Sequence, residues 1–230
     1  MALLGKGVLA IWNGIAPGGE DEFVAWHVRE HIPERVGIAG FLRGRRYVAI
    51  EGKPKFFNFY ETETPQVLTS PAYLARLNAP SDWTRLTIAT FLDTTRTVCD
   101  VVQSLGYGEG AWIEALRFST DTPGRQVVQA LAGAVLPGLR EQPGIVGVHL
   151  LEGRIEASQG STTEKQLRKQ PDRVVGAVLL IEAIDAECLA AARATIASDT
   201  AIAASGAGRG FEAGRYRLQF GLRHAELAGS

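Results

Sequence analysis

The sequence predicts an α+β fold in which two similar halves each have the element order βαββαβ. The expected strands and helices follow the same order twice within the 230 residues. The halves align at one offset of 104 residues, which matches Val8 with Trp112 and Gly40 with Gly144. The chain is 46% hydrophobic and 21% charged, a composition typical of compact cores and not of disorder.

The first half begins with a strand and a helix. Residues 8–12 are a short apolar run with β-favouring side chains, and the turn-forming residues 13–19 follow. From Glu20, acidic residues in the first turn precede apolar residues at helical spacing, and Pro33 lies near the far end. This pattern predicts an amphipathic helix of about three turns. Its apolar residues are Phe23, Val24, Val28 and Ile32.

Both halves can be completed with the same set of elements. The first half is expected to continue with hairpin strands at 41–50 and 56–61, a short helix at 71–77 and a strand within 87–102. The second half is expected to have strands at 112–118, 145–151, 174–183 and 215–222, with helices at 125–140 and 186–198. A polar insertion at 156–173 lengthens its hairpin, and the glycine-rich residues 106–110 are interpreted as the linker. We therefore divide the chain into modules 1–105 and 106–230, with the expected pocket in the first.

A βαββαβ unit has both helices on one face of a four-stranded sheet, so its other face needs a partner. Two units in tandem can cover each other. The arrangement resembles the dimeric α+β barrel superfamily, in the form where two ferredoxin-like modules are fused in one chain. The segments WHVREHIPER at 26–35 and GFLRGRRY at 40–47 are similar to its EthD-like branch. The resemblance implies a pocket between sheet and helices for small, often aromatic molecules, in a superfamily of cofactor-free monooxygenases, cyclases, isomerases and haem enzymes.

Two of the four histidines, His27 and His31, lie four residues apart on the first expected helix, next to Glu30. Side chains with this spacing share a helix face. An imidazole that faces an apolar pocket can take and return a proton, and Glu30 could orient it. In the other interpretation, one histidine packs on the sheet and the other is solvated.

The same residues match the pattern H-x-x-E-H, in which two histidines bind zinc and the glutamate acts on metal-bound water. A zinc site needs a third protein ligand, and no downstream helix offers an obvious glutamate pair. We therefore expect no metal; if a metal binds, His27 and His31 are its expected ligands.

Alternation along the strand that begins at Phe41 puts Arg43, Arg45 and Tyr47 on one face and Arg46 on the other. A guanidinium near the helix layer could neutralise oxyanion charge, and Arg45 or Arg46 is expected in this role. The alternative is that these arginines pair with nearby glutamates or solvent. The side chains expected to shape the pocket are Trp12, Trp26, Arg46, Asn58, Tyr60, Tyr73 and Trp83.

Other features exclude several classes of protein. A formal net charge of −1, without a long run of like charge, argues against nucleic acid and membrane partners. Two widely spaced cysteines argue against a disulfide scaffold, so we expect a cytoplasmic protein. Because the resembled superfamily includes haem enzymes with a histidine ligand, the resemblance also makes His149 and His224 candidates for haem ligation. The glycine-rich stretches do not lie on a strand-to-helix turn, which a dinucleotide site needs.

We therefore expect a small-molecule enzyme without a bound cofactor, in which His27 or His31 is the acid/base for an aromatic or enolisable substrate. A lyase, isomerase, cyclase or monooxygenase would fit. The alternatives are a non-catalytic protein that binds a small molecule in the same pocket, and a zinc-dependent hydrolase. Because the fused modules can close the barrel alone, a homodimer is compatible with the sequence but not required.

Overall fold

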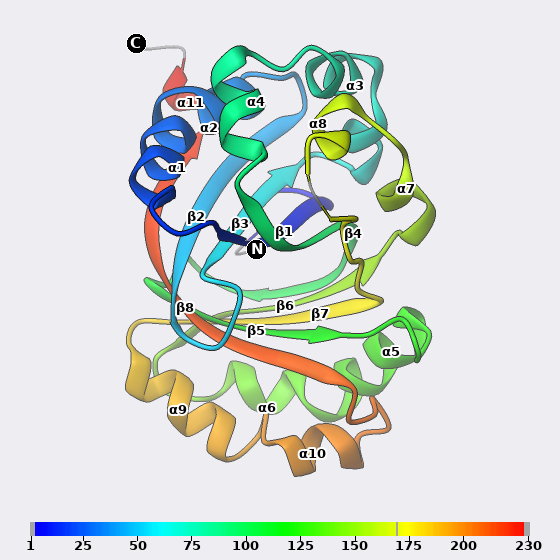
Figure 1. Ribbon diagram of the computed structural model, residues 1–230. Helices are drawn as coiled ribbons and strands as arrows, with labels where there is room; N and C mark the ends of the chain where they lie inside the picture. The colour runs from blue at the N-terminus through cyan, green and yellow to red at the C-terminus, as the bar shows by residue number, and fades with distance from the viewer. Residues whose placement is uncertain (1–2, 169, 228–230) are drawn as a thin grey trace.

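The computed structural model describes residues 3–168 and 170–227. Eight antiparallel strands form a closed barrel in the order β1-β3-β2-β8-β5-β7-β6-β4 (Figure 1). The strands are β1 (Gly7–Ile15), β2 (Phe41–Glu51), β3 (Phe56–Thr62), β4 (Phe91–Gly106), β5 (Trp112–Phe118), β6 (Ile145–Gly153), β7 (Ala177–Ala183) and β8 (Phe211–Arg223).

The two halves of the barrel have the same strand order, which confirms the predicted fold class. The first half has the order β4-β1-β3-β2 and the second has β8-β5-β7-β6. Pairing of β2 with β8, which places Arg46 opposite Phe220, joins the halves along one edge. Pairing of β4 with β6 joins the other edge and leaves the described barrel without a free strand edge.

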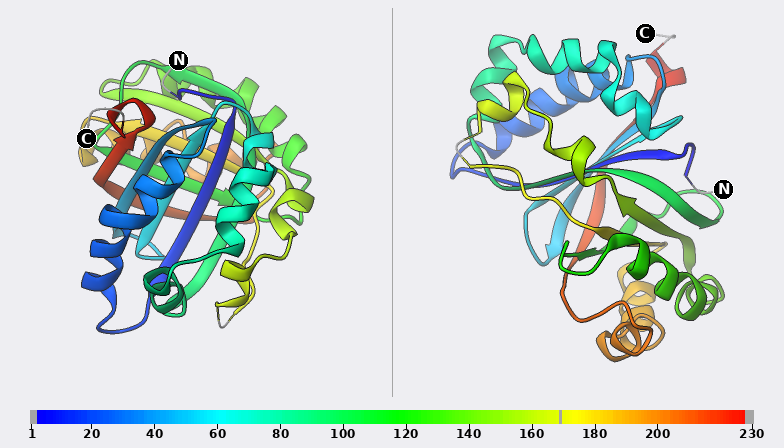
Figure 2. Two further views of the ribbon diagram at one scale, coloured as in Figure 1. Left: turned by 90° about the horizontal axis from the view of Figure 1, so that it is seen from above. Right: turned by 90° about the vertical axis from the view of Figure 1, so that its right-hand side faces the viewer.

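Helices cover the barrel on two opposite sides (Figures 1 and 2). The first side carries α1 (Glu20–Trp26), η1 (His27–His31), α2 (Ile32–Val36), η2 (Pro65–Thr69), α3 (Pro71–Asn78) and α4 (Asp82–Ile88). The second carries α5 (Gly124–Ala134), α6 (Leu136–Arg140), α9 (Ala186–Ala194) and α10 (Asp199–Ala204). The short helix α11 (His224–Leu227) follows β8. The helix expected at 125–140 is therefore divided into α5 and α6, whereas the helix expected at 186–198 ends at Ala194 and α10 follows it.

Alternation along each strand divides the side chains between the barrel interior and the helix layers. The interior is aromatic: the ring centroids of Trp12 and Phe57 are 4.5 Å apart, and Tyr47 and Tyr216 pack on Phe57. The helix layer of the second module is a large apolar cluster. The helix layer of the first module, in contrast, buries His27, His31 and Arg35 among its apolar side chains.

The polar insertion expected at 156–173 lies between β6 and β7, the hairpin strands of the second half. It contains the helices α7 (Ile155–Gln159) and α8 (Thr163–Gln166), which lie against the first module. Arg154 donates its backbone N–H to Val98, and the Ser158 hydroxyl accepts from the Val98 N–H. Residues 154–168, called the crossing segment below, thus follow β4 and pack on α3 (Figure 1).

Candidate active site

A small, partly open cavity lies between the first sheet and its helices. Its volume is about 20 Å³, enough for roughly one water molecule. It is lined by apolar and aromatic side chains (Leu9, Ile11, Trp26, Tyr60, Tyr73, Leu77, Ile88 and Phe91) and by polar ones (His27, His31, Arg35, Asn58, Arg96, Glu164 and Arg168). Six of the residues expected from the sequence therefore meet here: Trp26, His27, His31, Asn58, Tyr60 and Tyr73.

Both histidines lie on a π-helical turn that interrupts the first helix. The backbone N–H of Ile32 donates to the carbonyl of His27, which is an i to i+5 hydrogen bond. The two imidazole rings face each other with centroids 5.4 Å apart and planes inclined by 20°. Trp26 lies 4.2 Å from the His31 ring, and Phe23 lies 5.0 Å from the His27 ring. Single π turns occur frequently at functional sites because they redirect side chains of a helix.

One ring nitrogen of His27 has a hydrogen-bond partner, and the other has none. Its Nε2 lies 3.1 Å from the hydroxyl of Tyr60, whereas its Nδ1 has no hydrogen-bond partner. Nδ1 of His31 is also buried without a partner. Burial, followed by the positive charges of Arg46 and Arg35, holds the pKa of His27 well below its usual range. Burial, followed by the positive charge of Arg35, lowers the pKa of His31 in the same way, so both rings are neutral at pH 7.

Positive charge surrounds the two neutral rings. Arg35 forms ion pairs with Glu34 and Glu164, and it is 2% exposed. Arg96, 4% exposed, donates to the hydroxyl of Tyr73 at 3.0 Å. No carboxylate of the described residues lies within ion-pair distance of Arg96. Arg96 is therefore a buried cation that lacks a counter-ion, and such a charge is costly unless an anion joins it.

The crossing segment supplies one wall of this cavity. Glu164 pairs with Arg35 across the module boundary, and Arg168 pairs with Asp172. The Arg168 guanidinium also lies 5.7 Å from the centroid of Phe91. The pocket of the first module is thus completed by charged residues of the second.

Glu30 does not face the histidines. Its carboxylate accepts hydrogen bonds from the hydroxyls of Ser81 and Thr84, and the Thr84 hydroxyl accepts from the indole N–H of Trp26 at 3.1 Å. Since Ser81 caps the N-terminus of α4, Glu30 links η1 to α4. It positions a helix of the cavity wall and has no contact with either imidazole among the described hydrogen bonds.

Arg45 and Trp12 lie inside the barrel, on the opposite face of the sheet from the cavity. Arg45 is fully buried and forms ion pairs with Glu61 at 3.1 Å and Glu182 at 2.9 Å. These two acidic partners already neutralise its charge, and the sheet separates it from His27. Arg45 and Trp12 are therefore not brought together with the histidines.

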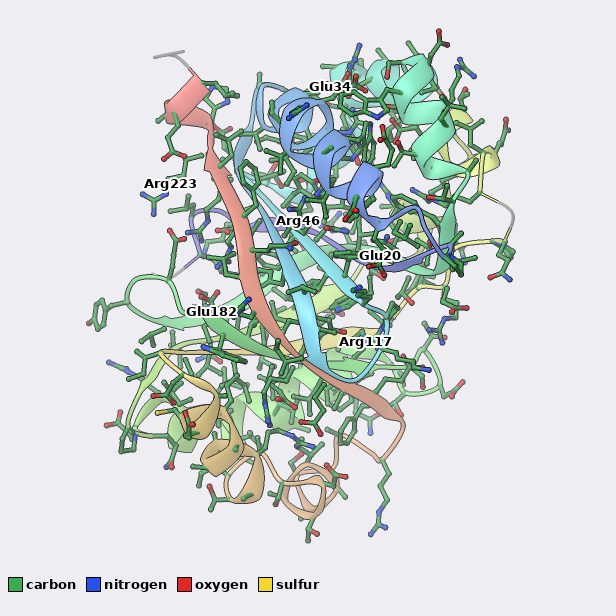
Figure 3. The ribbon with its side chains drawn as sticks, turned by 60° about the vertical axis from the view of Figure 1, so that its left-hand side comes forward. Glu20, Glu34, Arg46, Arg117, Glu182 and Arg223 are labelled. Atoms are coloured by element: carbon green, nitrogen blue, oxygen red, sulfur yellow. The ribbon has the colours of Figure 1, made fainter. Side chains whose placement is uncertain are left out.

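Arg46 and Trp83 lie on the helix side but outside the cavity lining. Arg46 donates to the carbonyl of Val24 at 3.3 Å and to the side chain of Gln219 at 2.9 Å, and lies between β2 and α1 (Figure 3). Trp83 donates its indole N–H to Glu22 near the surface. Both support the helix layer.

The cavity contains four charged residues that the sequence did not single out, namely Arg35, Arg96, Glu164 and Arg168. Arg35 follows His31 by four residues, so the same spacing that joined the histidines could have identified it. Arg96 alternates with Val98 on β4, but alternation alone does not say which face is covered by helices. Glu164 and Arg168 carried no local signal, because they reach the site from the other module.

The metal and haem alternatives lack suitable surroundings. In the described part of the chain, no group of three or more His, Cys, Asp or Glu side chains converges as a metal site. His149 points into the barrel, where Nδ1 lies 2.9 Å from the Ser104 hydroxyl and Nε2 lies 3.4 Å from Glu182. His224 contacts the carbonyl of Val36 through Nδ1 at 2.7 Å. Neither histidine faces a cavity of the size that haem needs.

Comparison with known proteins identifies the fold. No family model and no curated protein matches the sequence. An anthrone oxidase-like protein superposes with a TM-score of 0.65 over 99% of this chain and 97% of its own, at 14% identity. A proposed monooxygenase from Fusobacterium nucleatum has a TM-score of 0.61 over 96% of both chains, at 9% identity. A proposed monooxygenase from Lactobacillus acidophilus has a TM-score of 0.56 over 95% of this chain and 97% of its own, at 8% identity.

These similarities confirm the dimeric α+β barrel fold with two fused ferredoxin-like modules. They do not distinguish the EthD-like branch, which stays a prediction. Among the described helices, none has the length and apolar character needed to cross a membrane.

Proposed function

We propose that the chain is an enzyme that removes a proton from a small aromatic or enolisable substrate in the cavity of the first module, without a bound cofactor. The observation that carries this proposal is that a neutral His27 and a buried Arg96 line the same cavity. Arg96 has no carboxylate partner among the described residues. A neutral imidazole can accept a proton, and an unpaired guanidinium favours the anion that remains.

His27 is the proposed base. With a hydrogen on Nε2 donated to the Tyr60 oxygen, the unpartnered Nδ1 is free to accept the proton of a substrate C–H group. Burial raises the pKa of Tyr60 far above its usual range, so its hydroxyl stays protonated and does not compete as an anion. The low pKa of His27 makes it a weak base in the empty cavity. Formation of a substrate anion beside it offsets the positive charges that lower this pKa.

Arg96 is the proposed partner of the anion. As the C–H bond breaks, its electron pair moves to the carbonyl oxygen and produces an enolate, whose charge the Arg96 guanidinium stabilises. Arg35 and Arg168 already have carboxylate partners, so they contribute less. Tyr73, which accepts from Arg96, keeps its guanidinium in place.

The names of the similar structures favour oxygenation as the step that follows. In this step the substrate carbanion adds to O2 and forms a carbon–oxygen bond, and the peroxide takes the proton from His27. Loss of a second C–H proton and cleavage of the O–O bond then give a ketone and water. The balance is one CH2 group and one O2 consumed for one C=O group and one water formed.

Substrate binding requires the cavity to enlarge, since its present volume admits only about one water. The wall most suited to move is the crossing segment, which is held to α2 by the ion pair of Arg35 and Glu164 and to α3 by Asn78, which accepts from Thr163 at 3.0 Å. Closure over the substrate would exclude water and strengthen the interaction with Arg96.

Oxygen consumption with anthrone as the probe substrate tests the proposal. We expect O2 uptake and conversion of the CH2 group of anthrone to a second carbonyl group, above the uncatalysed rate, with the wild-type chain. His27→Gln and Arg96→Gln are expected to abolish most of this excess, whereas His224→Gln, which changes an exposed histidine, is the matched control. Recovery of bound anthrone chemically unchanged would instead favour a binding protein. Equal rates in wild type and His27→Gln would contradict the role of His27.

A further inference from the structure

A second open space lies at the end of the barrel, away from the helix–sheet cavity. Two adjoining clefts of about 730 and 650 Å³ share Arg117, Arg173 and Glu212 in their walls. Figure 3 shows Arg117 near the turn of the β2–β3 hairpin, at the mouth of the barrel. None of these three residues lines the cavity that holds His27. The volumes lie in the range typical of small-molecule sites.

Arg117 has incomplete hydrogen bonding although it is only 3% exposed. Its Nη2 donates to the backbone carbonyl of Lys53 at 2.6 Å and lies 3.0 Å from the carboxylate of Glu212. Its Nε and Nη1 atoms are buried and have no partner. A guanidinium can donate five hydrogen bonds, and leaving several unmade in a buried position is costly. The site therefore lacks an acceptor.

Two further buried donors without a partner, on Trp12 and Tyr216, lie close to Arg117, behind the residues that line the two clefts. The centroid of Trp12 lies 5.1 Å from the Arg117 guanidinium carbon, and the indole Nε1 of Trp12 has no partner. The hydroxyl of Tyr216 is also buried and unpartnered. It extends over Gly214, where a Cβ atom would lie only 2.6 Å from it, so the glycine makes room for this hydroxyl. Burial raises the pKa of Tyr216 to about 12, so the group stays a donor.

The net charge of the residues that line the larger cleft favours a ligand with a single negative charge. Its walls carry the cationic residues Lys53, Lys55, Arg117 and Arg173 and the acidic residues Asp93 and Glu212. Lys55 is paired with Glu20 outside the cleft. The remaining three cations exceed the two acidic groups by one charge. A monocarboxylate would balance this charge and provide oxygen acceptors.

We propose that the mouth of the barrel is a second ligand site, which holds the carboxylate of a small organic anion against the guanidinium of Arg117. One carboxylate oxygen accepts from the unpartnered nitrogens of Arg117, and Trp12 and Tyr216 donate to the same group. The apolar part of the ligand occupies the open cleft beside the β2–β3 hairpin. The site is independent of the proton-transfer chemistry proposed for the other cavity.

Benzoate is the probe for this site, and benzamide is the neutral probe of the same shape. Calorimetric titration of the full chain is expected to show saturable binding of benzoate, and at least tenfold weaker binding of benzamide. In a ¹H–¹⁵N spectrum, benzoate is expected to shift the indole resonance of Trp12, which Trp12→Phe assigns among the four tryptophans. This readout needs no variant of Arg117.

Arg117→Met should weaken benzoate binding at least tenfold, and Arg117→Lys, which keeps the charge, should weaken it less. Arg46→Met is the matched control, because it removes a buried arginine that lines neither the two clefts nor the cavity of His27, and it should leave this affinity unchanged. Circular dichroism confirms that each variant is folded. The proposal is overturned by the absence of saturable benzoate binding, by equal binding of benzamide, or by a Trp12 resonance that does not move at saturation. Absence of saturable benzoate binding would mean that the unpartnered nitrogens of Arg117 bind only water.

Discussion

The hydroxyl of Tyr60 lies 3.1 Å from Nε2 of His27, and both side chains are almost completely buried. Tyr60 comes from a central strand and His27 from a π-helical turn, so this contact joins the sheet to the helix layer at the cavity. It fixes the orientation of the imidazole and leaves Nδ1 as its only free nitrogen.

Tyr60→Phe removes the oxygen that holds Nε2 of His27. We expect turnover to fall about 10- to 100-fold, because the base loses its fixed orientation. The free energy of unfolding should fall by about 1–3 kcal/mol, since Nε2 becomes a buried polar atom without a partner. Steady-state kinetics and urea unfolding measure the two effects. Unchanged turnover with lowered stability would restrict Tyr60 to a structural role.

The two buried histidines predict a loss of stability in acid. Their pKa values are lowered in the folded chain below the usual 6.5, so between that value and the folded pKa the unfolded chain binds more protons. Their contribution is fully present above about pH 6.5 and is lost as the pH falls through the folded pKa. Each can contribute a slope of up to about 1.4 kcal/mol per pH unit.

Urea unfolding between pH 7.5 and pH 5 measures this dependence. His27→Gln and His31→Gln should each flatten the curve below pH 6.5, whereas His224→Gln should not. Curves of equal slope in all four chains would show that other groups cause the acid sensitivity.

Glu30→Ala separates a positioning role from an acid/base role. The change removes the acceptor of the Ser81 and Thr84 hydroxyls, so we expect the free energy of unfolding to fall by about 1–3 kcal/mol. The pH at which kcat is half-maximal should stay the same, because Glu30 has no contact with His27. A shift of that pH would show that Glu30 takes part in proton transfer.

The ion pair of Arg35 and Glu164 couples the crossing segment to the first module. Glu164→Gln leaves Arg35 with Glu34 as its remaining acidic partner, and we expect a loss of roughly 2 kcal/mol or more. Arg35→Met combined with Glu164→Leu should recover part of this loss, because no buried charge is left unpaired. A double-mutant cycle by urea unfolding measures the coupling. Additive effects would mean that the two side chains do not depend on each other.

Much of the fold could be predicted from the sequence because its signals are local. Alternating and helical periodicities marked the strands and helices, and the 104-residue offset between Val8 and Trp112 indicated the repeat. The paired βαββαβ order then required two sheets that cover each other. The crossing segment was missed because nothing within 156–173 indicates that it packs on α3 and β4 of the other module.

The candidate site was predicted only in part, and the reason is geometric. Alternation correctly separated Arg45 from Arg46 but could not say which face of β2 lies inside the barrel. Gly44 and Arg46 face the helices, since a Cβ at Gly44 would lie 3.0 Å from Ile32. Arg45 consequently points at Glu61 and Glu182 in the interior. Arg96, which has no carboxylate partner among residues 3–168 and 170–227, is recognised only when the surroundings of β4 are known.

The proposed stabilisation of a substrate anion in the cavity of His27 can be measured through the ionisation of bound p-nitrophenol. The titration is followed by the absorbance of the phenolate, in the Arg117→Met background so that the barrel mouth does not contribute. We expect the pKa of the bound phenol to be lower than in water, and Arg96→Gln to abolish this decrease. A bound phenol whose pKa rises, or one that is unaffected by Arg96→Gln, would contradict the account.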